Sequence, residues 1–155
     1  MKLVDKRVFI DALPEVVYEL LTDARLLVEW MGPIAHIEPR AGGTITWTHA
    51  NGDTVAGTFL ELVPSRRIVF TYGWDREDVG IPHGSTTVEI ELRPRDGGTE
   101  LHLVHRGLTA QMADAHSGGW ANYLGRLAAV AEGRDPGPDA LVNERVPSAS
   151  STHSA

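Results

Sequence analysis

Near residue 108 the sequence changes from the periodicity of strands to that of a long helix, and this change restricts the folds that the chain can adopt. Between residues 34 and 107, turn-forming residues separate short runs in which apolar and polar side chains alternate, as they do in strands. Residues 109–133 instead repeat apolar side chains with a period near 3.6, which predicts one long helix. A sheet with one apolar face must bury that face. The final helix is the predicted element that is long enough to cover it.

Turn signals divide residues 34–107 into about six strands, and they lie at 41–43, 51–53, 64–65, 75–84 and 96–98. Asn51 and Gly52 form a strong signal, because this pair favours a two-residue hairpin. On a later strand Phe70, Tyr72 and Trp74 share one face. The alternate positions along the predicted strands are mostly polar. We therefore expect one face of the sheet to meet water and the other to meet a core.

The N-terminal residues predict one further strand and two short helices. Residues 3–10 are rich in β-branched side chains, and Pro14 suits the first turn of a helix that ends near residue 23. A second short helix is predicted over residues 24–30. The expected fold class is therefore α+β, with a curved antiparallel sheet of about six to seven strands wrapped around a long C-terminal helix and with two short helices after the first strand.

Length and charge narrow the classes of domain and partner. The 155 residues suit one domain, which we expect to span residues 1–133. Residues 134–155 are rich in proline and serine, and this composition favours a mobile or loosely draped tail. The formal net charge of −7 argues against nucleic acid as a partner, because phosphate binding needs a clustered basic surface.

The sequence also bears on location. It contains no cysteine, which is compatible with a reducing cytoplasm. Asp5, Lys6 and Arg7 place charges where a signal peptide would need an apolar run. No apolar stretch approaches the roughly 20 residues that span a bilayer. We therefore expect a cytoplasmic protein that does not insert into a membrane.

Particular residues, in this order of elements, resemble a known family. The matching stretches are residues 17–23, Leu27, Trp30, 38–43, 64–74, 98–101, 105–108, 116–120, Tyr123, Leu124 and Leu127. They are similar to the activator of heat-shock-protein ATPase homologue family, within the START-like SRPBCC superfamily. The resemblance implies a helix-grip fold with a cavity between the sheet and the long helix. In related families this cavity holds lipids, sterols, polyketides or other apolar molecules.

The family takes its name from a eukaryotic co-chaperone that uses an additional domain, for which a chain of 155 residues leaves no room. The resemblance is therefore not taken to imply co-chaperone activity. Bacterial members of the family are mostly single domains of this size, often encoded beside small winged-helix repressors, which suggests a role in stress response or detoxification. The implied partner is a small apolar or aromatic ligand, and a homodimer is a further possibility.

Eight side chains are predicted to contact a ligand in this cavity. They are Trp30, Trp47, Tyr72, Trp74, His105, His116, Trp120 and Tyr123. Tryptophan and tyrosine combine an apolar body with a polar tip that needs a partner when it is buried. A filled aromatic core is the alternative interpretation, and for Phe70 we favour it.

Other features keep more than one interpretation. His105 and His116 suit a polar handle for a ligand, a general base or a structural hydrogen bond. Gly118 and Gly119, within the long helix, indicate either close packing against the sheet or space for a ligand. The segment 75–84 is long enough for a lid or for a solvated connection. The spacing of the histidines predicts no metal site, and we expect no cofactor.

Three functions follow from these observations. The first is binding of a small hydrophobic or aromatic molecule without catalysis. The second is an enzyme of the cyclase, dehydratase or hydrolase type, with His105 or His116 as base, which would need a histidine and a carboxylate within reach of each other inside the cavity. The third is a protein-interaction or chaperone-adaptor module.

Overall fold

The computed structural model describes residues 2–141 and 144–148. Its elements are β1 (Lys2–Ile10), α1 (Pro14–Thr22), α2 (Ala24–Leu27), β2 (Ile34–Ile37), β3 (Thr44–Thr48), β4 (Thr54–Val63), β5 (Arg67–Trp74), the 3-10 helix η1 (Glu77–Val79), β6 (Thr86–Arg95), β7 (Gly98–Leu108) and α3 (Ala110–Ala131). This order confirms the predicted α+β class.

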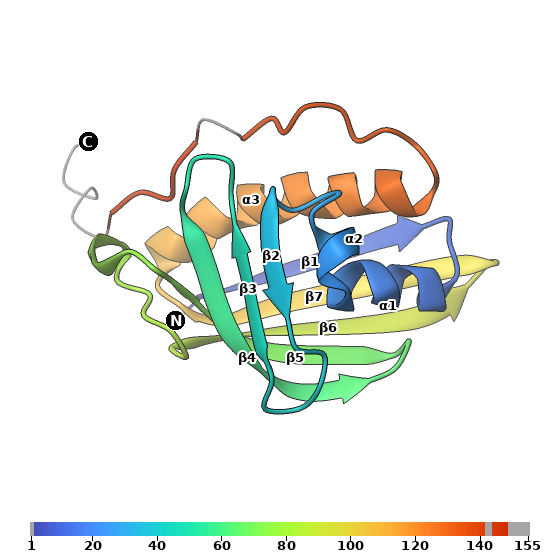
Figure 1. Cartoon of the computed structure of the whole chain (residues 1–155), viewed down its shortest axis with the longest axis horizontal. Helices are drawn as coiled ribbons and strands as arrows, with labels where there is room; N and C mark the ends of the chain where they lie inside the picture. The colour runs from blue at the N-terminus through green and yellow to red at the C-terminus, as the bar shows by residue number, and fades with distance from the viewer. Residues whose placement is uncertain (1, 142–143, 149–155) are drawn as a thin grey trace.

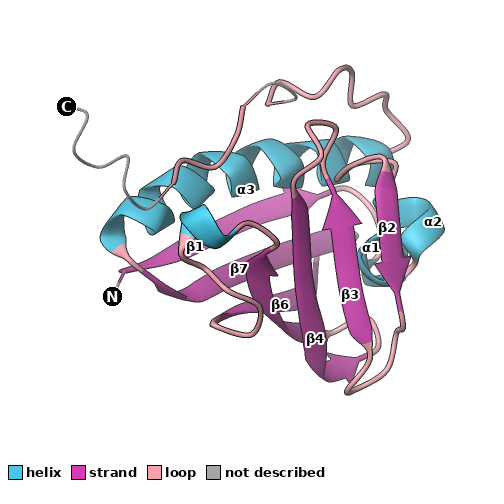
Figure 2. Ribbon diagram, turned by 60° about the vertical axis from the view of Figure 1, so that its left-hand side comes forward, coloured by secondary structure: helices cyan, strands magenta, loops and turns pink. Residues whose placement is uncertain are grey.

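All strands belong to one seven-stranded antiparallel sheet, in the order β1-β7-β6-β5-β4-β3-β2. From β2 to β7 each strand pairs with its neighbour in the chain, which short hairpin connections allow. The first strand, β1, joins the opposite edge beside β7. The sheet curves around α3, which lies across its inner face, while α2 lies beside β2 and α1 lies beside α2 (Figures 1 and 2). This is the helix-grip arrangement that the resemblance implied.

The alternation along the central strands separates the two faces of the sheet as predicted. On β6, Val88 and Ile90 are buried with exposures of 0% and 1%. Glu89 and Glu91, at the alternate positions, accept hydrogen bonds from Arg67 on β5 at 3.1 and 3.0 Å. The inner face is therefore apolar, and the outer face carries ion pairs across neighbouring strands.

The long helix begins and ends close to the predicted residues. The side chain of Thr109 accepts a hydrogen bond from the backbone N–H of Met112 at 3.2 Å, which makes it the N-cap of α3. Gly133 follows the helix with a φ of 78°, the left-handed conformation that commonly ends a helix. Toward the C-terminal end of α3, Leu124 and Leu127 are buried in the core.

The second short helix is shorter than the predicted residues 24–30. α2 ends at Leu27, and the chain continues in turns. The backbone N–H of Trp30 donates to the carbonyl oxygen of Leu27 at 3.2 Å, a tighter spacing than that of an α-helix. The indole of Trp30 donates to the carbonyl oxygen of Leu20 on α1 at 2.8 Å. Tertiary anchoring of the indole thus accompanies the early end of the helix.

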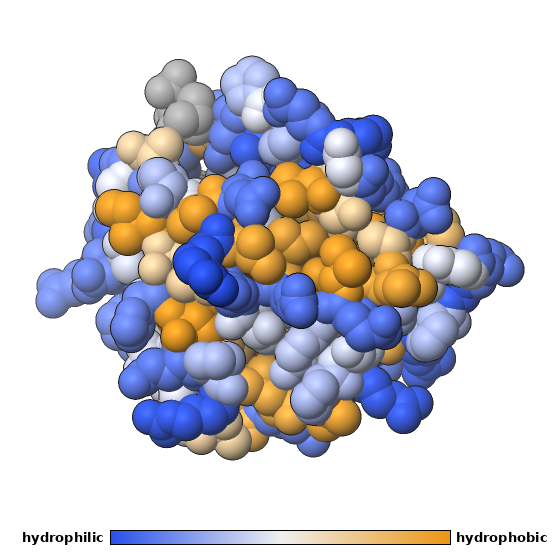
Figure 3. Space-filling view, turned by 45° about the vertical axis from the view of Figure 1, so that its right-hand side comes forward, coloured by the Kyte–Doolittle hydropathy of each residue, from blue (hydrophilic) through white to orange (hydrophobic). Residues whose placement is uncertain are grey.

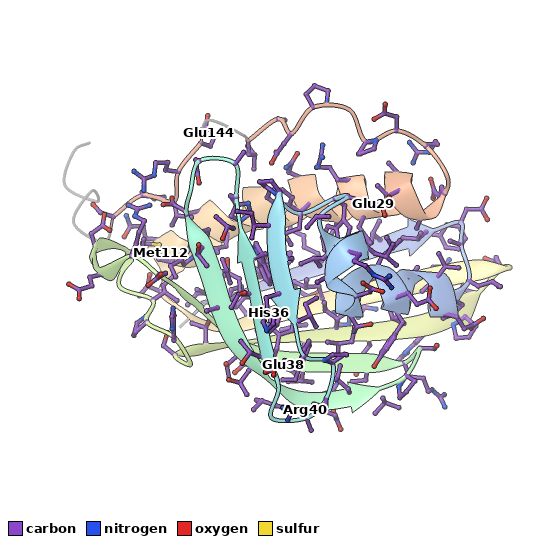
Figure 4. The ribbon with its side chains drawn as sticks, in the orientation of Figure 1. Glu29, His36, Glu38, Arg40, Met112 and Glu144 are labelled. Carbon is purple, nitrogen blue, oxygen red and sulfur yellow. The ribbon has the colours of Figure 1, made fainter. Side chains whose placement is uncertain are left out.

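The described residues of the predicted tail run back along α3 toward the β3–β4 hairpin (Figure 1). The side chain of Asn51 in this hairpin donates to the carbonyl oxygen of Glu144 at 2.8 Å, and Figure 4 shows Glu144 beside the hairpin tip. Mobility of residues 134–155 stays a prediction, and residues 142–143 and 149–155 lie outside the described part of the chain.

None of the helices in residues 2–141 and 144–148 combines the length and the apolar character that crossing a membrane requires.

Two glycine substitutions test the packing of this fold. A Cβ atom at Gly57 on β4 would overlap the carbonyl oxygen of Thr71 on β5, whereas a Cβ at Gly118 on α3 would meet nothing within 4 Å. We expect Gly57→Ala to lower the free energy of unfolding by about 1–3 kcal/mol, because the strands must separate. Gly118→Ala should raise it by up to about 1 kcal/mol through helix propensity. Urea unfolding measures both changes, and equal stability of the two variants would contradict the strand packing.

Candidate functional site

A cavity of about 330 Å³ lies between the sheet and the N-terminal half of α3. Its wall comes from β3 and the β3–β4 hairpin, from β5, from α3 and from the described residues that follow α3. The lining residues are Met31, Trp47, His49, Ala50, Asn51, Asp53, Tyr72, Trp74, Ala115, His116, Gly118, Gly119, Trp120, Tyr123, Asp139, Leu141, Glu144, Arg145, Val146 and Pro147.

Six of the eight predicted ligand contacts are in this wall, and they are Trp47, Tyr72, Trp74, His116, Trp120 and Tyr123. The structure places the other two elsewhere. His105 is fully buried, where its ring packs 4.4 Å from the ring of Tyr72. Trp30 is bound to α1 through its indole and lines a separate space of about 10 Å³. Contact of any of these side chains with a ligand stays a prediction.

Three of the tryptophans donate their indole N–H groups to histidines. Trp74 donates to Nε2 of His116 at 2.9 Å, and so connects β5 to α3. Trp120 donates to Nδ1 of His105 at 3.1 Å, and so connects α3 to β7. In the third pair Trp47 on β3 donates to Nε2 of His49, the residue that follows this strand, at 3.1 Å. Indole is a donor only, so each of these imidazole nitrogens must be the acceptor.

These bonds determine the tautomers of the two buried histidines, His105 and His116. His116 accepts at Nε2 and therefore carries its proton on Nδ1, which donates to the carbonyl oxygen of Met112 at 2.7 Å. His105 accepts at Nδ1, so its Nε2–H donates to the hydroxyl of Thr86 at 2.9 Å. The hydroxyl of Thr86 in turn donates a hydrogen bond to the carbonyl oxygen of Tyr72 at 2.7 Å. Both rings are thus neutral, and both nitrogens of each ring are satisfied.

Burial reinforces the neutral state of these rings. Burial, followed by the neighbouring His116, lowers the pKa of His105 to about 3. Burial also lowers the pKa of His116, although the hydrogen bond to Met112 acts in the opposite direction. For His49 burial again lowers the pKa, against the charges of Asp139 and Asp53. The imidazoles of the wall and of the layer behind it therefore carry no charge at neutral pH.

Sequence reasoning did not find the polar part of the wall. Asp53 in the β3–β4 hairpin is only 4% exposed and pairs with Arg145, 92 residues away in the chain, and with Arg76. Asp139 accepts from the hydroxyl of Tyr123 on α3 at 2.7 Å. No local pattern marks such distant pairs. His49 had a usable signal, because it stands two residues after Trp47 and so shares its face of the strand.

Gly118 and Gly119 of α3 face open space. A Cβ atom at Gly118 or Gly119 would meet nothing within 4 Å, and both residues line the cavity. The close-packing explanation is therefore wrong for this helix. In the residues that the structure describes, no group of three or more His, Cys, Asp or Glu side chains is arranged to hold a metal ion.

The histidine bonds predict a specific acid sensitivity. An unfolded histidine has a pKa near 6.5, so lowering the pKa of His105 to about 3 makes the unfolded chain bind the proton first. The resulting contribution to stability is complete above about pH 6.5 and is lost as pH falls toward 3, by about 1.4 kcal/mol per pH unit. His105→Gln keeps an acceptor for Trp120 and a donor for Thr86 without the titration. When the free energy of unfolding is measured with urea between about pH 4 and pH 6.5, it should change less steeply with pH in this variant than in the parent protein.

Replacement of the exposed His36 by glutamine is the matched control, and it should leave the pH dependence as in the parent protein. If the free energy of unfolding of His105→Gln changed with pH as steeply as that of the parent protein, His105 would not be the source of the acid sensitivity.

Comparison with known proteins places the chain in a family. Residues 11–132 match the family described as Activator of Hsp90 ATPase homolog 1-like protein. The human Activator of 90 kDa heat shock protein ATPase homolog 1 is 28% identical over 111 residues, which are 71% of this chain and 31% of that protein. The chain therefore spans about a third of the length of this relative.

Solved structures agree with this match. An AHSA1-like protein from Rhizobium etli is 39% identical, with a TM-score of 0.69 and with 94% of this chain and 91% of that chain covered. The Aha1 dimer from Colwellia psychrerythraea is 22% identical, with a TM-score of 0.71 over 85% of this chain and 97% of that chain, a likeness that shows the fold alone. Because the family model covers well over half of its residues, the chain belongs to the Activator of Hsp90 ATPase homolog 1-like family.

Proposed function

We propose that the protein binds a small apolar or aromatic molecule in the cavity beneath α3. The observation that carries this proposal is the cavity itself, whose volume of about 330 Å³ falls at the lower end of the roughly 300–1,000 Å³ of small-molecule sites. Rings of Trp47, Tyr72 and Trp74 line it from the sheet, and rings of Trp120 and Tyr123 line it from the helix. Large rigid rings of this kind bury much ligand surface at a low cost in side-chain entropy.

The glycines of the helix support the proposal. Glycine inside a helix costs about 1 kcal/mol relative to alanine. Gly118 and Gly119 incur this cost where they meet open space rather than a neighbouring backbone. A larger side chain at the half-buried Gly119 would take up space at the cavity, so this glycine keeps the cavity wide.

The hydrogen bonds of His105 and His116 favour binding over the enzyme hypothesis. A general base needs a free lone pair within reach of the proton that it abstracts. The acceptor nitrogens of both rings already hold indole N–H groups of Trp120 and Trp74. Their second nitrogens donate to Thr86 and Met112, which are not carboxylates. The histidine–carboxylate pair that the enzyme hypothesis needs is therefore not made by these two residues.

Protein interaction is the second candidate function, and exposed apolar side chains favour it. Figure 3 shows apolar residues gathered across one face of the molecule. The large apolar side chains that remain exposed include Leu13, Ile34 and Leu60, at 54%, 62% and 55%. The solved Aha1 protein from Colwellia psychrerythraea is a dimer, and a homodimer of this chain is the corresponding proposal. Sedimentation over a range of concentrations tests it, and a monomer at all of them would oppose it.

Two leucine substitutions on α3 test the cavity directly. Gly119 lines the cavity, whereas Gly125 is exposed on the same helix, and a Cβ atom meets nothing within 4 Å at either position. We expect an apolar aromatic probe such as 2-naphthol to raise the melting temperature of the parent protein. At 100 times its dissociation constant, the probe should add about 2.7 kcal/mol to the free energy of unfolding. Gly119→Leu should abolish this shift by filling the lumen, and Gly125→Leu should preserve it.

Thermal unfolding followed by circular dichroism, with and without the probe, gives the result. Because both substitutions replace a helical glycine, their effects on the ligand-free protein should be similar. Loss of the shift in Gly125→Leu as well, or its survival in Gly119→Leu, would place the probe outside the cavity. A panel of neutral aromatic probes that leaves the parent protein unshifted would oppose binding itself.

A further inference from the structure

The charged groups in the wall of the cavity are mostly acidic. Among the described residues the wall contains three carboxylates and one guanidinium, and they are Asp53, Asp139, Glu144 and Arg145. The histidines of the wall are neutral for the reasons given above. Because Asp53 and Arg145 pair with each other, the carboxylates that remain for a charged ligand are those of Asp139 and Glu144, in a space where charges are screened less than in water.

The guanidinium in the wall is already occupied. Arg145 donates to both carboxylate oxygens of Asp53, at 3.0 Å through Nε and through a second, shorter bond from Nη2. Arg76 donates to the same carboxylate at 3.2 Å and to the carbonyl oxygen of Val146 at 2.8 Å. An acidic ligand that recruited Arg145 would have to leave the 4% exposed carboxylate of Asp53 with less compensation.

Asp139 presents the opposite situation, because the groups that donate hydrogen bonds to it are neutral. Its Oδ1 accepts from Asn122 at 3.0 Å and from the backbone N–H of Leu141 at 2.8 Å, and its Oδ2 accepts from the hydroxyl of Tyr123 at 2.7 Å. Burial raises the pKa of this carboxyl, but these donors together hold it below the ordinary value. Asp139 is therefore an ionised carboxylate at the cavity.

Arg126, whose charge acts on Asp139, donates its hydrogen bonds to other acceptors. These bonds go to the carbonyl oxygens of Trp30 at 3.0 Å and of Gly137 at 2.8 Å. Because each carboxylate oxygen accepts about two hydrogen bonds, Oδ1 of Asp139 is filled and Oδ2 keeps one lone pair for a further cation.

Electron-rich rings stand next to this carboxylate. The ring of His49 packs 5.2 Å from the ring of Tyr123 and 5.7 Å from the ring of Trp74, and all three residues line the cavity. Tyr123 itself is hydrogen-bonded to Asp139. Faces of tryptophan and tyrosine attract cations within about 6 Å of the ring centroid, and more strongly when the site excludes water.

We propose that the ligand of this cavity is a protonated amine on an aromatic or apolar body, with its ammonium group against Asp139 and its body among the rings of Trp47, Trp74 and Tyr123. This inference rests on the proposed binding function and adds the charge of the ligand to it. It excludes carboxylic acids such as fatty acids, which would face the acidic wall without a free guanidinium or imidazolium.

Three probes with one ring system test the sign of the charge. Tryptamine, tryptophol and indole-3-acetate share the indole ring and carry an ammonium, a hydroxyl and a carboxylate on short side chains. Isothermal titration calorimetry at neutral pH should give tryptamine a dissociation constant about tenfold below that of tryptophol. Indole-3-acetate should bind more weakly than tryptophol. High salt should reduce the advantage of tryptamine.

Asp139→Asn is the variant that tests the residue. It keeps an oxygen acceptor and removes the charge, so tryptamine should lose its advantage while the affinity for tryptophol stays the same. Asp96→Asn is the matched control, because Asp96 lies in the β6–β7 turn with its side chain 81% exposed and the substitution changes the net charge equally. This control should preserve the tenfold preference.

The outcomes separate the two proposals. Indole-3-acetate binding as tightly as tryptamine would overturn the amine inference and leave the proposed function standing, as would an unchanged preference in a folded Asp139→Asn variant. If all three probes and the neutral panel fail to bind the parent protein, the proposed function falls, and the inference falls with it. Should Asp139→Asn unfold, the order of the three probes on the parent protein decides.

Discussion

The hydrogen bonds between indoles and imidazoles are what the layer under the N-terminal half of α3 depends on. Trp74 reaches from β5 to His116 on α3, and Trp120 reaches back from α3 to His105 on β7. A buried polar group without a partner costs about 1–3 kcal/mol, so breaking either bond would leave two such groups in the core. Hydrogen bonds between rings therefore connect the sheet to the helix, and the size of these rings sets the distance between sheet and helix.

This spacing explains why one half of the helix covers a cavity and the other half does not. Toward the C-terminal end, Leu124 and Leu127 fill the space between helix and sheet, and Leu127 has an exposure of 0%. Toward the N-terminal end, Gly119 contributes no side chain where the helix lines the cavity. Rigid rings held at their tips cannot collapse into the gap as aliphatic chains would. The same helix thus serves as core and as cavity wall.

Much of this architecture was predictable because it follows from local periodicity. Both signals are properties of neighbouring residues. The alternation around Phe70 and Tyr72 predicts the sheet and its two faces, and the cap at Thr109 predicts where the long helix begins. The wall was predictable in part, since Trp47, Trp74 and Trp120 are aromatic residues on inward positions. The partner of each indole was not predictable, because it depends on side-chain geometry across the fold. Trp30 shows the limit, since a backbone carbonyl on α1 holds its indole away from the cavity.

The polar chemistry of the cavity lies partly beyond the reach of the family comparison. The family match ends at residue 132, whereas Asp139 and Arg145 follow it. The aromatic side chains of the wall therefore lie in the matched part of the chain, and the residues after α3 add the charges of Asp139 and Arg145. These residues also place Asp53 in an ion pair, which removes a hairpin carboxylate from the groups available to a ligand. A few charges at the wall of a cavity are enough to set which ligand it prefers, because specificity is a difference of affinities.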